Sequence, residues 1–360
     1  MSKARKVLSM GASYGSLLAI KLVAAGHDVK LACTPAGAAA FNANGARVRM
    51  PLRGGAESFE IDSHTLPGRL SAAKPDDVRP EGYDLVVLAM QEPQYRLPGV
   101  RELLQAVAVS RVPCMSIMNM PPPPFLRRIP GVPVDAMRSC YADFDAWRAF
   151  EPGKMTLCSP DPQAFRPPGE PPNVLQVRLA TNFKAARFAS DADTALLREL
   201  EAGIEAARFD TPEGRIELPV KLKVHDSLFV PIAKWSMLLA GNYRCVGADG
   251  MRPIRDAVHG DLDASRSVYE WVSRLSMDCG AAAEDLVPFD KYANAARSLG
   301  SPSSVARALA GGATAIERVD RLVQAIGAAR GQRSEAVDAI VANVDRWIEE
   351  NLRKSAVEAV

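Results

Sequence analysis

The sequence lacks the residue patterns that mark most metal sites, membrane spans and nucleic-acid-binding surfaces. Its six cysteines have no Cys-x-x-Cys spacing and no His-x-x-x-His partner, so no zinc site is expected and the thiols are expected to be reduced. No apolar run reaches the length of a membrane-spanning helix. The 44 basic and 42 acidic residues nearly balance. We therefore expect neither nucleic acid nor a membrane as a partner.

The N-terminal segment also lacks the features of a secretory signal. A basic segment, residues 1–6, precedes an apolar run at 7–10 that ends at Gly11. This apolar run is too short for a signal peptide. Together with reduced thiols, this predicts a cytoplasmic protein. A chain of 360 residues with 48% hydrophobic and 24% charged residues is long enough for two domains, each with its own core.

The first third of the chain alternates between strand-like and helix-like segments. Residues 6–10 are typical of a short buried strand, 16–25 have helical apolar spacing that Gly26 closes, and 28–33 are typical of the next strand. The pattern continues with a strand at 83–90, a helix around 98–109 and a strand at 112–118. This order predicts a βαβ beginning and a mostly parallel sheet.

Strand signals fade in the later part of the chain. Helical periodicity is found at 226–243, 255–279, 302–330 and 333–353. We place the domain boundary near residue 218. The sequence thus predicts a Rossmann-type α/β domain at 1–218 and an all-helical domain at 219–360.

Four stretches of the chain, taken together in order and spacing, resemble the ketopantoate reductases. They are residues 6–34, 83–91 with the strand that ends at Asn119, 226–242 and 301–331. The resemblance implies an N-terminal Rossmann-type domain and an all-helical C-terminal domain like that of 6-phosphogluconate dehydrogenase. Members of the family use NADPH to reduce the ketone of a branched 2-keto acid, and their helical domain often supports dimers.

The resemblance also implies where a cofactor would bind. The family's Gly-x-Gly-x-x-Gly fingerprint falls on Met10, Ala12 and Gly15, or in a shifted register on Gly11 and Gly15. The implied cofactor-binding residues are Gly11, Ala12, Ser13, Tyr14, Gly15, Thr34, Gln91 and Asn119. Thr34 replaces the family's Arg for the 2′-phosphate, and Gln91 replaces its Lys, so the choice between NADP and NAD stays open. Lys30 and Arg47 are the nearest cations.

The family's catalytic motif, Trp-x-Lys-Leu-x-x-Asn, is altered here. Alignment on Trp235 places Met237 at the Lys and Gly241 at the Asn. Lys234 lies three residues before Met237 on the same helix face, so its long side chain could act as a displaced proton donor, or it could simply face solvent. Asn242 lies one residue past the family's Asn and would need a local register change to serve. Lys234, Asn119 and Asn242 are the catalytic candidates.

The substrate-binding residues are altered as well. Ser303 falls where the family has its substrate-binding Ser, with Ser304 equally available, and either could merely cap a helix. Ala315 replaces the family's Glu, and on a continuous helix Glu317 would face away. Arg318 would share the face of Ala315, where a guanidinium could bind a carboxylate.

Two functions follow from these residues. The first is an NAD(P)-dependent reductase of a 2-keto acid or related carbonyl compound, with a small carboxylate as substrate and a homodimer as in other family members. The second is a Rossmann-fold protein that has lost hydride transfer and binds a ligand, or performs non-redox chemistry, in the interdomain cleft. The altered fingerprint and the missing Lys and Glu favour the second, whereas Asn119 and the length of the resemblance favour the first.

Overall fold

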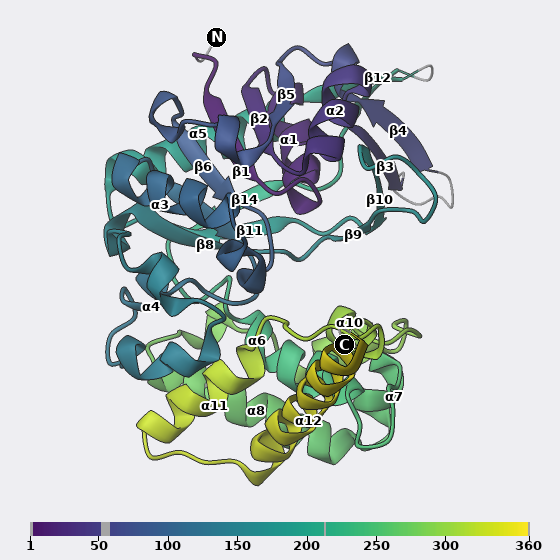
Figure 1. Ribbon diagram of the computed structural model, residues 1–360. Helices are drawn as coiled ribbons and strands as arrows, with labels where there is room; N and C mark the ends of the chain where they lie inside the picture. Colours follow the sequence, from purple (N-terminus) through teal and green to yellow (C-terminus); the bar gives the residue numbers. More distant parts are fainter. Residues whose placement is uncertain (1–2, 52–57, 212–213, 359–360) are drawn as a thin grey trace. The chain divides into compact units, whose positions relative to one another are not determined.

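The computed structural model describes residues 3–51, 58–211 and 214–358. The chain forms two compact units (Figure 1). The first comprises Met1–Arg128 and Asp145–Asp226, and the second comprises Ile129–Phe144 and Ser227–Val360. The chain therefore enters the second unit once before returning to the first, unlike the single boundary between residues 218 and 219 that the sequence suggested.

Within the described residues, the first unit is built on a sheet of eight strands. In spatial order these are β14 (Leu222–His225), β11 (Phe183–Ala186), β8 (Met155–Ser159), β7 (Cys114–Ile117), β6 (Leu85–Leu88), β1 (Lys6–Met10), β2 (Asp28–Ala32) and β5 (Leu70–Ala73). Strands from β5 to β8 run parallel, whereas β11 is antiparallel to β8. The order β5-β2-β1-β6-β7-β8 is that of a Rossmann fold. The predicted mostly parallel sheet is confirmed.

The core of the first unit is formed by apolar residues of the central strands and of the helices that pack against them. All four residues of β6 are fully buried, as expected for a strand covered on both faces. The helices of the unit are α1 (Tyr14–Ala24), α2 (Pro35–Asn44), α3 (Val100–Ser110), α4 (Pro123–Leu126) and α5 (Asp191–Ala206). Helices α1 and α5 contact each other, and α5 buries Leu197, Leu200 and Ile204. Their apolar faces thus complete the layer against the sheet.

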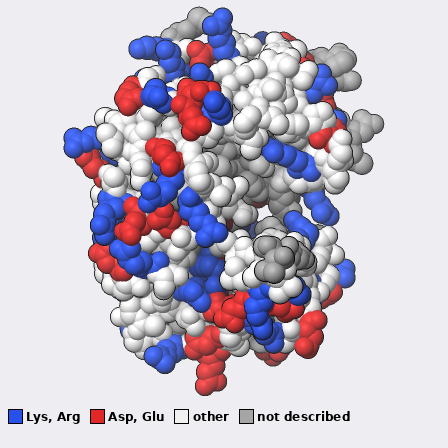
Figure 2. All heavy atoms as spheres, viewed as in Figure 1, with Lys and Arg blue, Asp and Glu red and all other residues white. Residues whose placement is uncertain are grey.

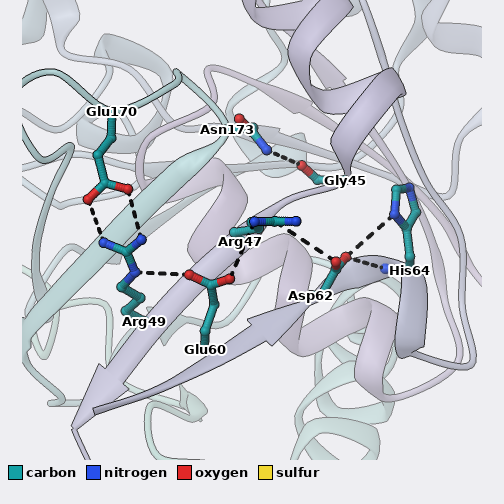
Figure 3. Close-up of polar contacts among 8 residues, drawn as sticks. All are labelled: Gly45, Arg47, Arg49, Glu60, Asp62, His64, Glu170 and Asn173. Carbon is teal, nitrogen blue, oxygen red and sulfur yellow. Dashed lines mark hydrogen bonds and ion pairs between the residues drawn. The ribbon is translucent and has the colours of Figure 1, made fainter.

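In the part of the chain that the structure describes, two smaller sheets accompany the main one. One has the order β4 (Ser58–Asp62), β3 (Arg47–Pro51), β10 (Val174–Leu179) and β9 (Gln163–Phe165), and the other pairs β12 (Arg208–Thr211) with β13 (Gly214–Glu217). An ion-pair ladder crosses the first of them (Figure 3). Arg49 bonds Glu170 through both guanidinium Nη atoms, at 2.5 and 2.8 Å, and Glu60 through Nε at 2.9 Å. Arg47 pairs with Glu60 and Asp62 in the same ladder.

The regular elements described in the second unit are helices, as predicted, apart from an isolated bridge between Val246 and Met251. Its helices are α6 (Lys234–Met237), α7 (Ile254–His259), α8 (Leu262–Asp278), α9 (Phe289–Ala296), α10 (Ser304–Ala310), α11 (Val319–Ala329) and α12 (Glu335–Glu358). Amphipathic α8 and α11 bury their apolar faces. No helix among the described residues is both long and apolar enough to cross a membrane. On the face drawn in Figure 2, acidic and basic side chains are interspersed.

Three expected helices differ from the structure. The stretch 255–279 is divided at Gly260 and Asp261 into α7 and α8. The periodic stretch 302–330 is interrupted, because α10 ends before Gly311 and Gly312, the latter with φ of +86°. A left-handed glycine ends a helix readily, and α11 begins only at Val319. The stretch 226–243 becomes helical only from Lys234. The segment carrying Arg318 is therefore not part of a continuous helix.

One lysine of α1, Lys21, is buried in the first unit. Lys21 is 1% exposed, and its Nζ donates to the carbonyl of Pro219 at 2.8 Å. Burial, and then the positive charge of Lys221, lowers the pKa of Lys21 from 10.5 to about 6, against the opposing effect of Glu217 and Glu205. The neutral amine is therefore the main form of Lys21 in the folded protein at pH 7.

We expect Lys21→Met to raise the free energy of unfolding by about 2 kcal/mol near pH 7. Between pH 6 and 10.5 the unfolded chain binds a proton at Lys21 that the folded chain does not, so wild-type stability rises with pH in this window. The variant lacks this rise, and its advantage should shrink between pH 6.5 and 9 in urea titrations. Lys223→Met is the control, because Glu205 raises the pKa of that lysine. A constant advantage, or a less stable variant at pH 6.5, would show that Lys21 is not held neutral.

Candidate functional site

The turn between β1 and α1 depends on Gly11. Its φ is +103°, and a Cβ there would lie 2.5 Å from Met90 Cγ and 2.7 Å from the Ala89 carbonyl oxygen. Met10, at the first fingerprint position, is instead a buried strand residue. The sharp turn of the fingerprint is thus made by Gly11 and not by residue 10.

The N-terminus of α1 follows this turn directly. Ser13 is the N-cap residue, and its carbonyl accepts the backbone N–H of Ser16 at 3.1 Å. A Cβ at Gly15 would lie 2.4 Å from Ser9 Oγ, so this glycine lets the helix approach β1 closely. The first-turn amides of a helix lack intrahelical acceptors and carry partial positive charge. Ala12 is 6% exposed, and Tyr14 donates its hydroxyl to the Pro162 carbonyl at 3.0 Å.

The other candidates of the first unit follow neighbouring parallel strands. Thr34 comes after β2 and caps α2, since its Oγ1 accepts the Gly37 N–H at 3.2 Å. Gln91 follows β6, is exposed, and begins a short 3₁₀ helix. Asn119 follows β7 and is half-buried. Because the carboxyl ends of parallel strands share one edge, these residues lie along the same edge as Gly11.

A cation that the sequence did not suggest lies near the end of β2. Burial raises the pKa of the Cys33 thiol, whereas the positive charge of Arg166 lowers it. Arg166 directly follows β9 and is exposed, far from Cys33 along the chain. By contrast, the guanidinium of Arg47 is engaged in the ladder of Figure 3. Arg166 rather than Arg47 therefore brings positive charge to this strand end.

In the second unit, α6 continues into a π-turn, η8 (Leu238–Asn242). The backbone N–H of Tyr243 bonds the Leu238 carbonyl five residues earlier. A π-turn holds one residue more than an α-turn, so Asn242 takes the direction that residue 241 would have in an uninterrupted α-helix. The helix therefore contains the one-residue register change that Asn242 needs. Lys234, the first residue of α6, is half-buried.

Among the described residues, side chains from three segments bond carbonyl oxygens of this turn or of Met237 just before it. The Tyr292 hydroxyl donates to the Met237 carbonyl at 3.2 Å, the Cys245 thiol to that of Gly241 at 3.3 Å, and the Ser303 hydroxyl to that of Asn242 at 2.7 Å. A Cβ at position 241 would lie 1.9 Å from Tyr292 Oη. Only glycine therefore fits where Tyr292 approaches the helix. No local sequence pattern predicts this contact, since Tyr292 comes from α9.

Ser303 and Ser304 have different surroundings. Ser303 is buried, and besides bonding Asn242 it accepts the Ala306 N–H at 3.1 Å, which caps α10. Ser304 is exposed at the first position of that helix. The structure thus brings Ser303 and Asn242 together, but the Ser303 hydroxyl is already used in hydrogen bonds within the protein. The side chain of Ser304 lies at the surface.

Arg318 does not have the position expected for it. It precedes α11 in a non-helical segment and is bound to Asp320 at 3.0 and 2.8 Å and to Asp345 at 2.6 Å. Burial raises the pKa of the Asp320 carboxyl, which the Arg318 guanidinium opposes. The helical placement was therefore wrong, and two carboxylates of the chain itself already neutralise this guanidinium.

Solved structures are similar to this chain over nearly its whole length. A provisionally assigned ketopantoate reductase from Ralstonia solanacearum MolK2 has 15% identity and a TM-score of 0.70, with 97% of this chain and 99% of that chain covered. The 2-dehydropantoate 2-reductase from Methylococcus capsulatus has 12% identity and a TM-score of 0.68, with 96% and 97% covered. The chain has the ketopantoate reductase fold.

The same fold occurs in a second kind of dehydrogenase. D-mandelate dehydrogenase, in its ternary structure with NADH and anilino(oxo)acetate, has 12% identity and a TM-score of 0.64, with 96% of this chain and 99% of that chain covered. No family model matches the sequence, and no curated protein matches it. At such low identity, the ketopantoate reductase fold is what these structures share with the chain.

Proposed function

We propose that this protein is an NAD(P)H-dependent reductase of a 2-keto acid or a related carbonyl compound. The observation that carries the proposal is the left-handed Gly11 turn into the N-terminus of α1, set in the ketopantoate reductase fold. Such a turn is suited to a dinucleotide pyrophosphate. A homodimer belongs to the proposal as well, by analogy with the family.

The residues of the turn fit a dinucleotide, with one restriction. Gly11 and Gly15 let the turn and α1 approach Ala89 and Ser9 more closely than any Cβ would allow. The first-turn amides of α1, placed in this way, would hold the pyrophosphate. The Ala12 methyl narrows the approach to the backbone. Arg166, near the end of β2, would favour a phosphate on the adenosine ribose. The nicotinamide, when bound, supplies the hydride.

The chain's own residues would handle the charge that develops on the substrate. Hydride delivery turns a carbonyl into an alkoxide, which needs a proton or hydrogen bonds. In this proposal Lys234 gives the proton, and the amides of Asn119 and Asn242 donate hydrogen bonds. Ser304 contributes an exposed hydroxyl for the substrate.

The direct test is a set of branched 2-oxo acids offered with NADPH or NADH, with loss of nicotinamide absorbance as the signal. We expect saturable turnover of at least one of these acids. Cofactor binding without turnover of any acid would favour the non-redox alternative, in which the fold is kept and hydride transfer is lost.

Ala12→Gly is expected to tighten NADPH binding about threefold to tenfold, because removing the methyl lets the pyrophosphate approach the backbone. Fluorescence titration of the purified variant measures this. Ala25→Gly, at the opposite end of α1, controls for the general effect of an added glycine. An unchanged or weaker affinity in Ala12→Gly alone would mean that the pyrophosphate does not contact residue 12.

A further inference from the structure

The π-turn η8 needs side-chain support from elsewhere in the unit. A π-turn is rare and less favourable than continued α-helix, so it persists only where other contacts compensate. Here the supporting donors come from α9, from the N-cap of α10 and from the segment just after the turn. The Tyr292 contact is distinctive, because a continuous α-helix would use the Met237 carbonyl to accept the N–H of Gly241.

This contact links two departures from the family motif. The motif's Asn position is Gly241, a tyrosine hydroxyl occupies the space that its Cβ would need, and the amide appears one residue later at Asn242. A side chain at 241 and the hydroxyl of Tyr292 exclude each other, since their atoms would be 1.9 Å apart. The extra residue of the π-turn then compensates for the shifted Asn.

We propose that Tyr292 is a positioning residue, whose hydroxyl holds the π-turn and thereby sets the direction of the Asn242 side chain. The substrate role of Asn242 rests on the proposed function. The stabilisation of the π-turn by the Tyr292 hydroxyl does not. Tyr292 acts through the Met237 carbonyl and not on the substrate.

The surroundings of Tyr292 suit this task. Its ring stacks on Tyr269 with centroids 5.3 Å apart and an interplanar angle of 21°, and it is 7% exposed. Burial raises the pKa of the Tyr292 phenol, so the hydroxyl stays protonated and can donate. The ring is therefore fixed while its one polar atom faces the helix.

Amide hydrogen exchange of residues 238–243 tests the hold on the turn without any substrate. In Tyr292→Phe these amides should exchange about fivefold to tenfold faster, the loss expected for one buried hydrogen bond. Tyr269→Phe is the matched control, because it removes the hydroxyl of another buried tyrosine, which bonds the Val287 carbonyl at 2.7 Å instead. Unchanged exchange in Tyr292→Phe, or equal acceleration in Tyr269→Phe, overturns the proposal whatever the enzymatic activity.

A double-mutant cycle with Asn242→Ala tests the direction of the amide. Tyr292→Phe should raise the KM for the 2-oxo acid about fivefold, and this effect should vanish when Asn242 is already alanine. An undiminished effect in that background overturns the positioning role. Absence of all reductase activity together with faster exchange would instead contradict the proposed function and support the hold on the turn.

Deletion of Gly241 in the Tyr292→Phe background provides a rescue. The shortened helix reads Trp-Ser-Met-Leu-Leu-Ala-Asn, which restores the family spacing between Trp235 and the Asn without a π-turn. We expect the KM to return to within about twofold of the wild-type value, since the amide regains its direction. A KM that stays as high as in Tyr292→Phe alone contradicts the inference.

Discussion

Lys234→Ala is expected to lower kcat by about 10²- to 10³-fold while leaving the affinity for the cofactor unchanged. The size is that of a lost general acid at a developing alkoxide. Lys234 is the first residue of α6, one helical turn before Met237, which stands at the family's Lys position. Steady-state turnover of the best 2-oxo acid measures the effect.

Two further variants show whether position or mere charge matters. Lys291→Ala removes an exposed lysine from α9 of the same unit and should leave kcat unchanged. Lys234→Ala combined with Met237→Lys moves the ammonium to the family's position and should recover at least about tenfold of the lost kcat. Unchanged turnover in Lys234→Ala would show that Lys234 is not the proton donor.

Gly11→Ala is expected to weaken cofactor binding by about 30-fold or more. A φ of +103° is strained for alanine, and its Cβ would lie 2.5 Å from Met90 Cγ and 2.7 Å from a backbone oxygen. The turn must therefore shift, and the amides of α1 shift with it. Fluorescence titration and thermal unfolding of the same sample separate the loss of binding from the loss of stability.

Gly26→Ala is the matched control for the backbone strain. Gly26 also has a positive φ, of +85°, but no atom lies within 4 Å of a Cβ there. This variant should lose about 1 kcal/mol of stability without weaker cofactor binding. Equal losses of affinity in both variants would mean that strain alone, and not the shape of the Gly11 turn, explains the result.

The βαβ beginning and the helical second unit could be predicted because their signals are local. The apolar strands 6–10 and 83–90 and the helical spacing of 16–25 lie in continuous stretches, and the structure has elements there. Because the strands are parallel, their carboxyl ends meet at one edge of the sheet, where Thr34, Gln91 and Asn119 lie together with Gly11. This much of the candidate site follows from the sequence.

The remaining features depend on contacts between segments distant in the sequence. Arg166 approaches Cys33, and Tyr292 approaches Gly241, through folding that no periodicity encodes. Arg318 was misplaced because helical spacing was extended through Gly311 and Gly312, although adjacent glycines are a local signal for a helix end.

In the proposed function, the turn between β1 and α1 binds a nicotinamide dinucleotide. Titration of the purified protein with NADPH and with NADH, followed by nicotinamide fluorescence, tests this most directly. We expect saturable binding of at least one of them well below millimolar concentration, weakened by about 30-fold or more in Gly11→Ala but unchanged in Gly26→Ala. No binding of either cofactor at millimolar concentration would contradict it.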